Sequence, residues 1–188
     1  MVSFRIALGL LLTAAIWCGP GPVRADETIG GDFSLTDQDG RLFQLQQLRG
    51  KVVLVFFGYT FCPDICPTEM ANLSAVLHQL QDAPERVQGV FVTVDPERDT
   101  PQVLKHYVGY FNRHLIGLTG SPDQIGRVAR QYRVKYRKNL RPGGAYSMDH
   151  SANLYVIDPT GQLATMVPYG LPPEHVLGIV RRLLAEGR

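Results

Sequence analysis

Two runs of apolar residues constrain the fold of this chain more than any other feature. Residues 51–57 read KVVLVFF and residues 87–94 read VQGVFVTV. A strand with one face in water alternates apolar and polar residues, whereas a continuous, β-branched apolar run is typical of a strand covered on both faces. Between the two runs, residues 70–80 carry apolar side chains at helical spacing. The sequence therefore predicts two central strands of an α/β sheet, joined by a helix.

The remainder of the chain continues the alternation of strands and helices. Thr100 and Ser121 each stand before a proline, and an N-cap residue followed by proline is a helix start signal. A terminal amphipathic helix is predicted over residues 173–185. Further strands are predicted at residues 33–36, 41–45, 115–118, 152–157 and 163–167.

The order of these elements predicts one fold class. An N-terminal hairpin is followed by strands that alternate with helices, and a second hairpin, turned by residues 158–161 (DPTG), precedes the last helix. Alternation favours parallel pairing, while a final antiparallel hairpin and helix is what a thioredoxin-like fold requires. We therefore predict a mixed sheet flanked by helices, with the N-terminal β-hairpin as an extension.

Residues 1–25 have the layout of a secretory signal peptide. Arg5 gives a basic start, residues 6–17 are uncharged and apolar, and a Gly-Pro-Gly-Pro segment precedes Val-Arg-Ala, where we predict cleavage. The apolar run is shorter than the roughly 20 residues that cross a bilayer. Residues 26–188 are then a single exported domain, periplasmic in a bacterium. An uncleaved membrane tether and a lipoprotein signal ending at Cys18 are the alternatives.

The charge of the mature protein argues against one class of partner. The whole chain has a formal net charge of +2, and the predicted signal peptide contains two arginines and no acid, so its removal leaves zero. A protein that binds nucleic acid through phosphates needs a concentration of basic residues. We therefore expect no nucleic-acid partner.

Cleavage would leave two cysteines, Cys62 and Cys66, in a loop between a central strand and the following helix. Ligands of open α/β sheets bind at the carboxyl ends of strands, so the position itself suggests function. Pro63 favours a non-helical Cys62, and Pro67 suits a first helical turn, which predicts Cys66 as the N-cap with a lowered thiol pKa.

The cysteine spacing leaves three interpretations open. A structural disulfide is usual in an oxidising compartment, although so small a loop restricts the unfolded chain weakly. A redox-active pair is a second interpretation, with Cys62 and Cys66 as the reacting thiols. Three intervening residues also allow both sulfurs to face one ion, and two soft sulfurs suit Cu(I).

His150 differs from the other histidines because it precedes a predicted strand on the side facing the cysteine helix. Thioredoxins carry a cis-proline at this point, and this chain has none there. An imidazole beside two thiolates makes a site for copper or zinc. The alternative is a hydrogen-bonded loop histidine. Asp149 either orients a neighbouring group or is a solvated turn acid. Surface roles are expected for His78, His106, His114 and His175.

Three further motifs stand in the chain: residues 58–67 (GYTFCPDICP), residues 94–101 (VDPERDTP), and residues 149–151 (DHS) followed by a strand and Asp-Pro-Thr-Gly. In these segments the sequence resembles the SCO/SenC family, the copper chaperones of cytochrome c oxidase assembly. The resemblance runs over nearly the whole chain after the first 28 residues. Many family members keep a membrane anchor, whereas the apolar run here is short.

The resemblance implies Cys62, Cys66 and His150 as ligands of Cu(I) and Cu(II). It implies delivery of copper to the binuclear copper site of the oxidase, whose copper-binding subunit would be the partner, together with a copper donor and a periplasmic thiol reductant. The alternative function is a thiol-disulfide oxidoreductase acting on the cysteines of that copper site. Asp95 and Asp99 match the family pattern, with turn formation and helix capping as their expected roles.

Overall fold

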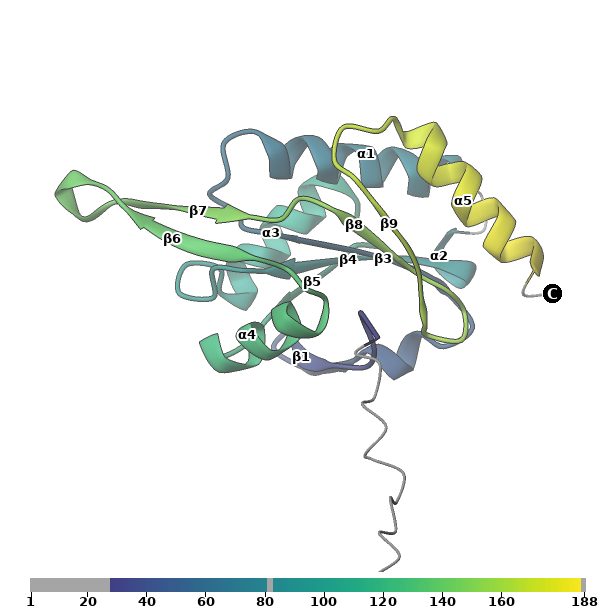
Figure 1. Ribbon diagram of the computed structural model, residues 1–188, viewed down its shortest axis with the longest axis horizontal. Coiled ribbons are helices and arrows are strands. Elements are labelled where there is room, and N and C mark those ends of the chain that lie inside the picture. Colours follow the sequence, from purple (N-terminus) through teal and green to yellow (C-terminus); the bar gives the residue numbers. More distant parts are fainter. Residues whose placement is uncertain (1–27, 81–82, 187–188) are drawn as a thin grey trace, which may run out of the picture.

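The main sheet of the computed structural model, which describes residues 28–80 and 83–186, has seven strands in the order β2-β1-β5-β4-β3-β8-β9 (Figure 1). The two apolar runs form its centre, where β3 pairs in parallel with β4 over the whole of both strands. The strands are β1 (Ser34–Asp37), β2 (Leu42–Gln44), β3 (Val52–Gly58), β4 (Val87–Thr93), β5 (Ile116–Thr119), β8 (Leu154–Ile157) and β9 (Leu163–Val167).

Parallel pairing is confined to the middle of the sheet. β4 also pairs in parallel with β5, whereas β8 runs antiparallel to β3 and β9 antiparallel to β8. The N-terminal hairpin of β1 and β2 extends the sheet at the other edge, where β1 pairs antiparallel to β5. This is a mixed sheet of the thioredoxin-like kind with an N-terminal hairpin, and the predicted fold class is confirmed.

Helices cover both faces of the sheet. In Figure 1, α1 and α5 lie on one face and α4 lies on the other, and α1 packs against both α3 and α5. The caps of α3 and α4 are as predicted, because Thr100 and Ser121 each accept a hydrogen bond from a backbone N–H of the first turn. The helices are α1 (Ile65–Gln79), α2 (Ala83–Arg86), α3 (Pro101–Phe111), α4 (Pro122–Gln131), α5 (Pro173–Glu186) and the 3₁₀ turns η1 (Leu45–Leu48) and η2 (Pro142–Gly144).

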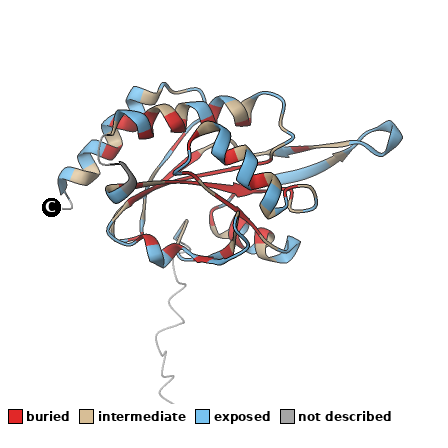
Figure 2. Ribbon diagram, turned by 180° about the vertical axis from the view of Figure 1, so that it is seen from behind, coloured by how far each residue is buried: buried red, intermediate tan, exposed pale blue. Residues whose placement is uncertain are grey.

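The central strands are buried from end to end. Every residue of β3 is buried, and Figure 2 shows the middle of the sheet enclosed between the helices. Burial on both faces explains why these strands read as uninterrupted apolar runs. The largest fully buried side chains include Phe56, Phe57, Phe91, Tyr132 and Tyr155.

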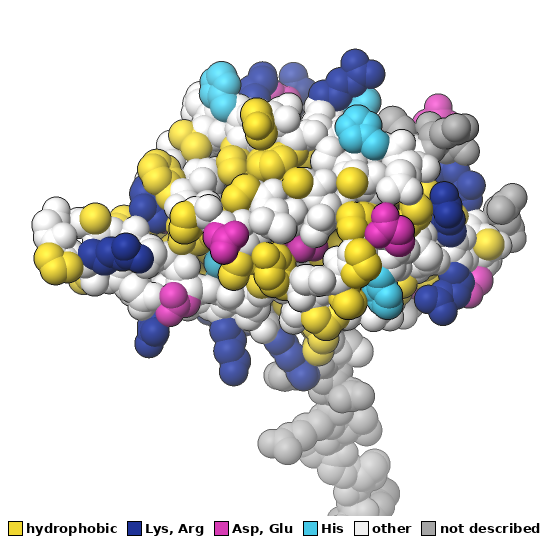
Figure 3. Space-filling model, turned by 90° about the horizontal axis from the view of Figure 1, so that it is seen from above, with side chains coloured by type: hydrophobic (Ala, Val, Ile, Leu, Met, Phe, Trp, Pro, Cys, Tyr) yellow, Lys and Arg dark blue, Asp and Glu magenta, His cyan; other side chains and the backbone are white. Residues whose placement is uncertain are grey.

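Two strands that the sequence patterns do not predict form a separate antiparallel ribbon. β6 (Tyr136–Leu140) pairs with β7 (Tyr146–His150), and η2 turns the chain between them. The ribbon projects from the body of the protein, is mostly exposed, and carries Lys and Arg side chains (Figures 2 and 3). Met148 is its one buried residue.

The predicted signal peptide, residues 1–25 with Cys18, lies outside the described residues. No helix in the part of the chain that the structure describes combines the length and the apolar character that crossing a bilayer requires.

Candidate metal centre

The cysteine loop, residues 59–64, leaves the carboxyl end of β3 and leads into α1. A backbone hydrogen bond from Cys62 N–H to the carbonyl of Tyr59, at 3.2 Å, turns the loop, and Cys66 N–H points at Cys62 Sγ at 3.4 Å. Both cysteines are free thiols. Cys66 is fully buried, whereas Cys62 is partly exposed. One sulfur is therefore accessible from solvent and the other is enclosed.

The start of α1 differs from the prediction. The helix begins at Ile65 with Asp64 as its N-cap, so Cys66 is the second helical residue and not the cap. Pro67 is the third, which is tolerated because the N–H groups of the first turn have no partner within the helix. The helix thus starts two residues before the proline.

Burial sets the protonation state of Cys66. It raises the pKa of this thiol well above the ordinary value, and the backbone hydrogen bond associated with Tyr59 lowers it by less. The predicted lowering of the pKa by the helix N-terminus is therefore wrong for the metal-free protein. Desolvation of a thiolate in an apolar surrounding outweighs the partial charge of the helix end.

His150 is the last residue of β7, a strand that the sequence patterns do not predict. Its Nδ1 lies 2.9 Å from the carbonyl oxygen of Ser151, which can only accept, so Nδ1 carries the proton. The unprotonated Nε2 then faces Cys66 Sγ at 3.3 Å. The rings of Phe56 and Tyr59 stand edge-on to the imidazole, and burial lowers its pKa, which favours the neutral form that binds metals.

The three side chains meet in one cluster. The two Sγ atoms and a nitrogen of His150 all lie within 4.8 Å of one another, and they form a group of the size that holds a metal ion. Two thiols and one neutral imidazole are soft and borderline donors, which suit Cu(I) and also accommodate Cu(II) or Zn(II). The carbonyl of Ser151 fixes the tautomer in the way that partners of metal-bound histidines usually do. This donor set fits copper.

Asp149 does not orient the cluster. Its carboxylate is exposed and pairs with Arg137 at 3.0 Å on the outside of the ribbon, which is the solvated role among the two alternatives. The remaining four histidines lie outside the metal cluster that the described residues form.

Asp95 and Asp99 are buried, which the sequence patterns do not indicate. Asp99 accepts hydrogen bonds from Thr60 N–H at 3.0 Å, from Thr60 Oγ1 at 2.6 Å and from Thr93 Oγ1 at 2.6 Å. Asp99 thus connects Thr93, at the end of β4, to Thr60, which lies in the cysteine loop two residues before Cys62. The burial of Asp99 could not be predicted from its own segment, because its hydrogen-bond partners Thr60 and Thr93 lie in other segments.

The chain is similar to a known protein family and to several of its members. A family model described as SCO1/SenC matches residues 22–185. The bovine (Bos taurus) protein SCO2 homolog, mitochondrial, is 42% identical over 161 residues, which are 84% of this chain and 60% of that protein. The chain therefore spans less than two thirds of this relative's length.

Two solved structures have the same architecture. Bradyrhizobium japonicum ScoI with copper bound is 41% identical, with a TM-score of 0.78 over 84% of this chain and 100% of the other. Arabidopsis thaliana ScoI with copper bound is 38% identical, with a TM-score of 0.79 over 85% of this chain and 99% of the other. Both proteins hold copper in those structures.

Proposed function

We propose that this chain, which belongs to the SCO1/SenC family, binds copper through Cys62, Cys66 and His150 and delivers it to the copper-binding subunit of cytochrome c oxidase. The observation that carries the proposal is the convergence of two thiols and a neutral imidazole, from two distant segments, within 4.8 Å. Copper-bound relatives of the same fold support copper over zinc as the ion.

Capture of Cu(I) needs two thiolates and a lone pair on nitrogen. Cys66 is protonated in the metal-free protein because burial raises its pKa, so binding releases its proton. His150 is neutral and already presents Nε2, so the third ligand needs no deprotonation. The imidazole nitrogen also stabilises Cu(II) more than two thiolates alone would.

Release follows from the uneven exposure of the ligands. Cys62 is partly exposed at the mouth of the site, whereas Cys66 lies beneath it. A partner can therefore replace Cys62 first and take the ion by exchange of one ligand after another. The partner proposed here is the oxidase subunit that holds the binuclear copper site.

The compartment determines the other partners. An exported domain of residues 26–188, released from a signal peptide, would meet oxidising conditions in the periplasm. Oxidation of the Cys62 and Cys66 thiols to a disulfide releases two electrons and two protons and removes both sulfur ligands. A thiol reductant must then restore the pair, and a copper donor must load it.

The test is metal loading of the reduced protein. We expect equimolar Cu(I) and Cu(II) binding, with a sulfur-to-copper charge-transfer band in the Cu(II) form that is lost in Cys62→Ser. His150→Ala should keep Cu(I) binding and lose most of the Cu(II) affinity.

The same experiment separates the alternative function, a thiol-disulfide oxidoreductase in which the cysteines are the reacting pair. That function predicts rapid reduction of a substrate disulfide by a wild-type protein that binds no copper. It also predicts that His150→Ala changes the rate of disulfide exchange and nothing else.

A further inference from the structure

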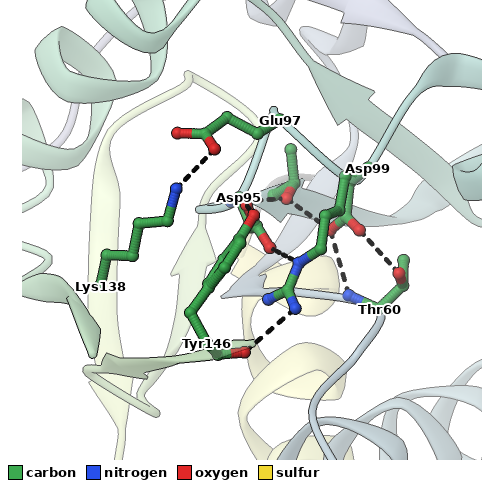
Figure 4. A network of polar contacts seen from close by, with 8 residues as sticks. Thr60, Asp95, Glu97, Asp99, Lys138 and Tyr146 are labelled. Carbon is green, nitrogen blue, oxygen red and sulfur yellow. Dashed lines mark hydrogen bonds and ion pairs between the residues drawn. The ribbon is translucent and has the colours of Figure 1, made fainter. Parts of the chain in front are cut away.

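The cysteine loop and the ribbon that carries His150 are both attached to a third segment. This segment is the β4–α3 loop, residues 94–100, which follows the central strand β4. Figure 4 shows Asp95, Asp99, Thr60 and Tyr146 converging around it, and none of these is a candidate metal ligand. The network therefore lies outside the cluster of donors and adjoins it.

Arg98 holds the ribbon at Tyr146. Its Nη1 donates to the backbone carbonyl of Tyr146 at 3.1 Å, and its guanidinium carbon lies 3.7 Å from the centre of the Tyr146 ring. Asp95 completes the arrangement, because it accepts from Arg98 Nε at 2.5 Å and from the Tyr146 hydroxyl at 2.9 Å. Backbone, ring and hydroxyl of Tyr146 are all engaged.

The same guanidinium contacts the cysteine loop. Its carbon lies 4.6 Å from the centre of the Phe61 ring and 5.7 Å from that of Tyr59. Tyr59 in turn stands edge-on to His150, with ring centres 5.8 Å apart. A cation placed among aromatic rings is attracted to their faces, so Arg98 joins the two halves of the site.

The ribbon needs such an attachment. Side chains of a strand alternate between faces, so Tyr146, Met148 and His150 share the face turned toward the body. Met148 is the one buried side chain of β6 and β7, and β6 is almost entirely exposed. A hydrophobic core therefore contributes little to fixing this pair of strands, which polar contacts hold: Arg98 and Asp95 bind Tyr146 of β7, and Glu97 pairs with Lys138 of β6.

We infer that Arg98 is a positioning residue for the metal site, which holds β7, and therefore His150, against the cysteine loop without contacting the ion. Partners that orient a metal-bound histidine typically change metal affinity by about 10–100-fold when they are removed. The inference rests on the proposed function for its copper measurement and stands on the metal-free structure otherwise.

The test compares the full-length wild type with Arg98→Met, which keeps most of the side-chain length and removes the charge and the hydrogen bonds. In the metal-free protein, we expect backbone amides of β7 to exchange hydrogen at least about tenfold faster. In the copper-loaded protein, Cu(II) affinity should fall at least about tenfold, and its spectrum should shift toward that of His150→Ala. Cu(I) binding by the two sulfurs should change less.

Two further variants make the result specific. Lys105→Met removes an exposed ion pair with Asp39, at 2.8 Å, and should leave both measurements unchanged. Arg98→Lys keeps the charge and loses the fork that spans Asp95 and Tyr146, so it should restore the two properties in part. It also serves as the test should Arg98→Met not fold.

The outcomes distinguish the inference from the function on which it rests. Wild-type exchange rates and a wild-type Cu(II) spectrum in both Arg98 variants would overturn the positioning role, while His150→Ala still lost Cu(II). A wild type and a His150→Ala variant with identical Cu(II) spectra would instead overturn the metal site. Hydrogen exchange in the metal-free protein would then still decide whether Arg98 holds the ribbon.

Discussion

His150 Nε2 lies 3.3 Å from Cys66 Sγ, although 84 positions separate the two residues in the sequence. Nε2 has a free lone pair because Nδ1–H donates to the carbonyl of Ser151, so the protonated Cys66 thiol can donate to Nε2. This contact satisfies the buried Cys66 thiol and the half-buried His150 ring in the metal-free protein. Under the proposed function, copper would replace the shared proton between side chains that already lie together.

The two thiols should differ in their reactivity toward alkylating reagents. Cys62 is partly exposed, while Cys66 is fully buried and has a raised pKa, so the Cys66 thiolate is both scarce and inaccessible. We expect iodoacetamide to modify Cys62 at least about tenfold faster than Cys66 at neutral pH. Mass spectrometry of the reduced, metal-free protein over time measures both rates.

The single variants Cys62→Ser and Cys66→Ser are the controls for this assignment. Cys66→Ser should react at the fast rate and Cys62→Ser at the slow rate. If the two cysteines of the folded wild type were alkylated at equal rates, and the two single variants also reacted at equal rates, Cys66 would be as accessible as Cys62.

The reduced, metal-free protein should lose stability at alkaline pH through Cys66. Below the ordinary thiol pKa of 9.0, Cys66 is protonated in both the folded and the unfolded state. Above it, the unfolded chain loses the proton and the folded protein retains it, so the free energy of unfolding falls as pH rises. The slope approaches about 1.4 kcal/mol per pH unit for one proton.

Urea unfolding of the wild type and of Cys66→Ala between pH 8 and pH 10 isolates this contribution. Burial also raises the pKa values of Tyr107 and Tyr132. Both tyrosines are present in both proteins, so their contribution cancels in the comparison, and the ordinary pKa of a tyrosine is higher than that of a thiol. The stability difference between the two proteins should shrink as pH rises. A difference that is constant over this range would contradict the raised pKa.

The strands of the main sheet could be predicted from the sequence because buried strands have a local pattern of apolar residues. β3 and β4 are buried nearly throughout, and continuous apolar runs mark both. The caps of α3 and α4 could also be predicted, because Thr100 and Ser121 form hydrogen bonds within the first turn of their own helices. Interactions between residues close in the sequence can be recognised from the sequence alone.

The ribbon and the buried acids could not be predicted because distant residues hold them. β6 reads YRKNL and has neither apolar alternation nor a buried residue. Its partners lie on other segments, because β6 pairs with β7, which Arg98 and Asp95 contact at Tyr146, and Lys138 of β6 pairs with Glu97. The three candidate ligands were named from motif and fold order, yet the protonation of Cys66 was not, because it depends on burial by the whole core.

Asp99 should be among the polar residues that contribute most to stability. It is fully buried and accepts three hydrogen bonds, two from Thr60 and one from Thr93. Asp99→Ala would leave these donors unpaired in the interior, which costs about 2–5 kcal/mol in the free energy of unfolding. Urea unfolding of the metal-free protein at neutral pH measures this cost.

Asp39→Ala is the matched control, since Asp39 is more exposed and pairs with the surface residue Lys105. Its effect should stay within about 0.5 kcal/mol. Asp99→Asn keeps an acceptor oxygen and should fall between the two. An Asp99→Ala variant as stable as the control would show that the Thr60 and Thr93 donors find other partners.

Gly58 should be intolerant of any side chain because Cys66 occupies the space above it. A Cβ at this position would lie 2.9 Å from Cys66 Sγ, 3.0 Å from a Phe91 ring carbon and 3.1 Å from a Phe56 ring carbon. Overpacking of this kind typically costs about 1–3 kcal/mol. Gly58→Ala should therefore destabilise the protein and also weaken copper binding, because the displaced atom is a candidate ligand.

Gly178→Ala provides the comparison for Gly58→Ala, since it lies within α5 and its Cβ would meet nothing within 4 Å. Alanine is a better helix former than glycine, so this variant should be more stable by roughly 0.5–1 kcal/mol with unchanged copper affinity. Thermal unfolding and copper titration of both variants give the two quantities. A Gly58→Ala protein that lost stability but bound copper as the wild type does would mean that Phe56 and Phe91 yield to the methyl group while Cys66 stays in place.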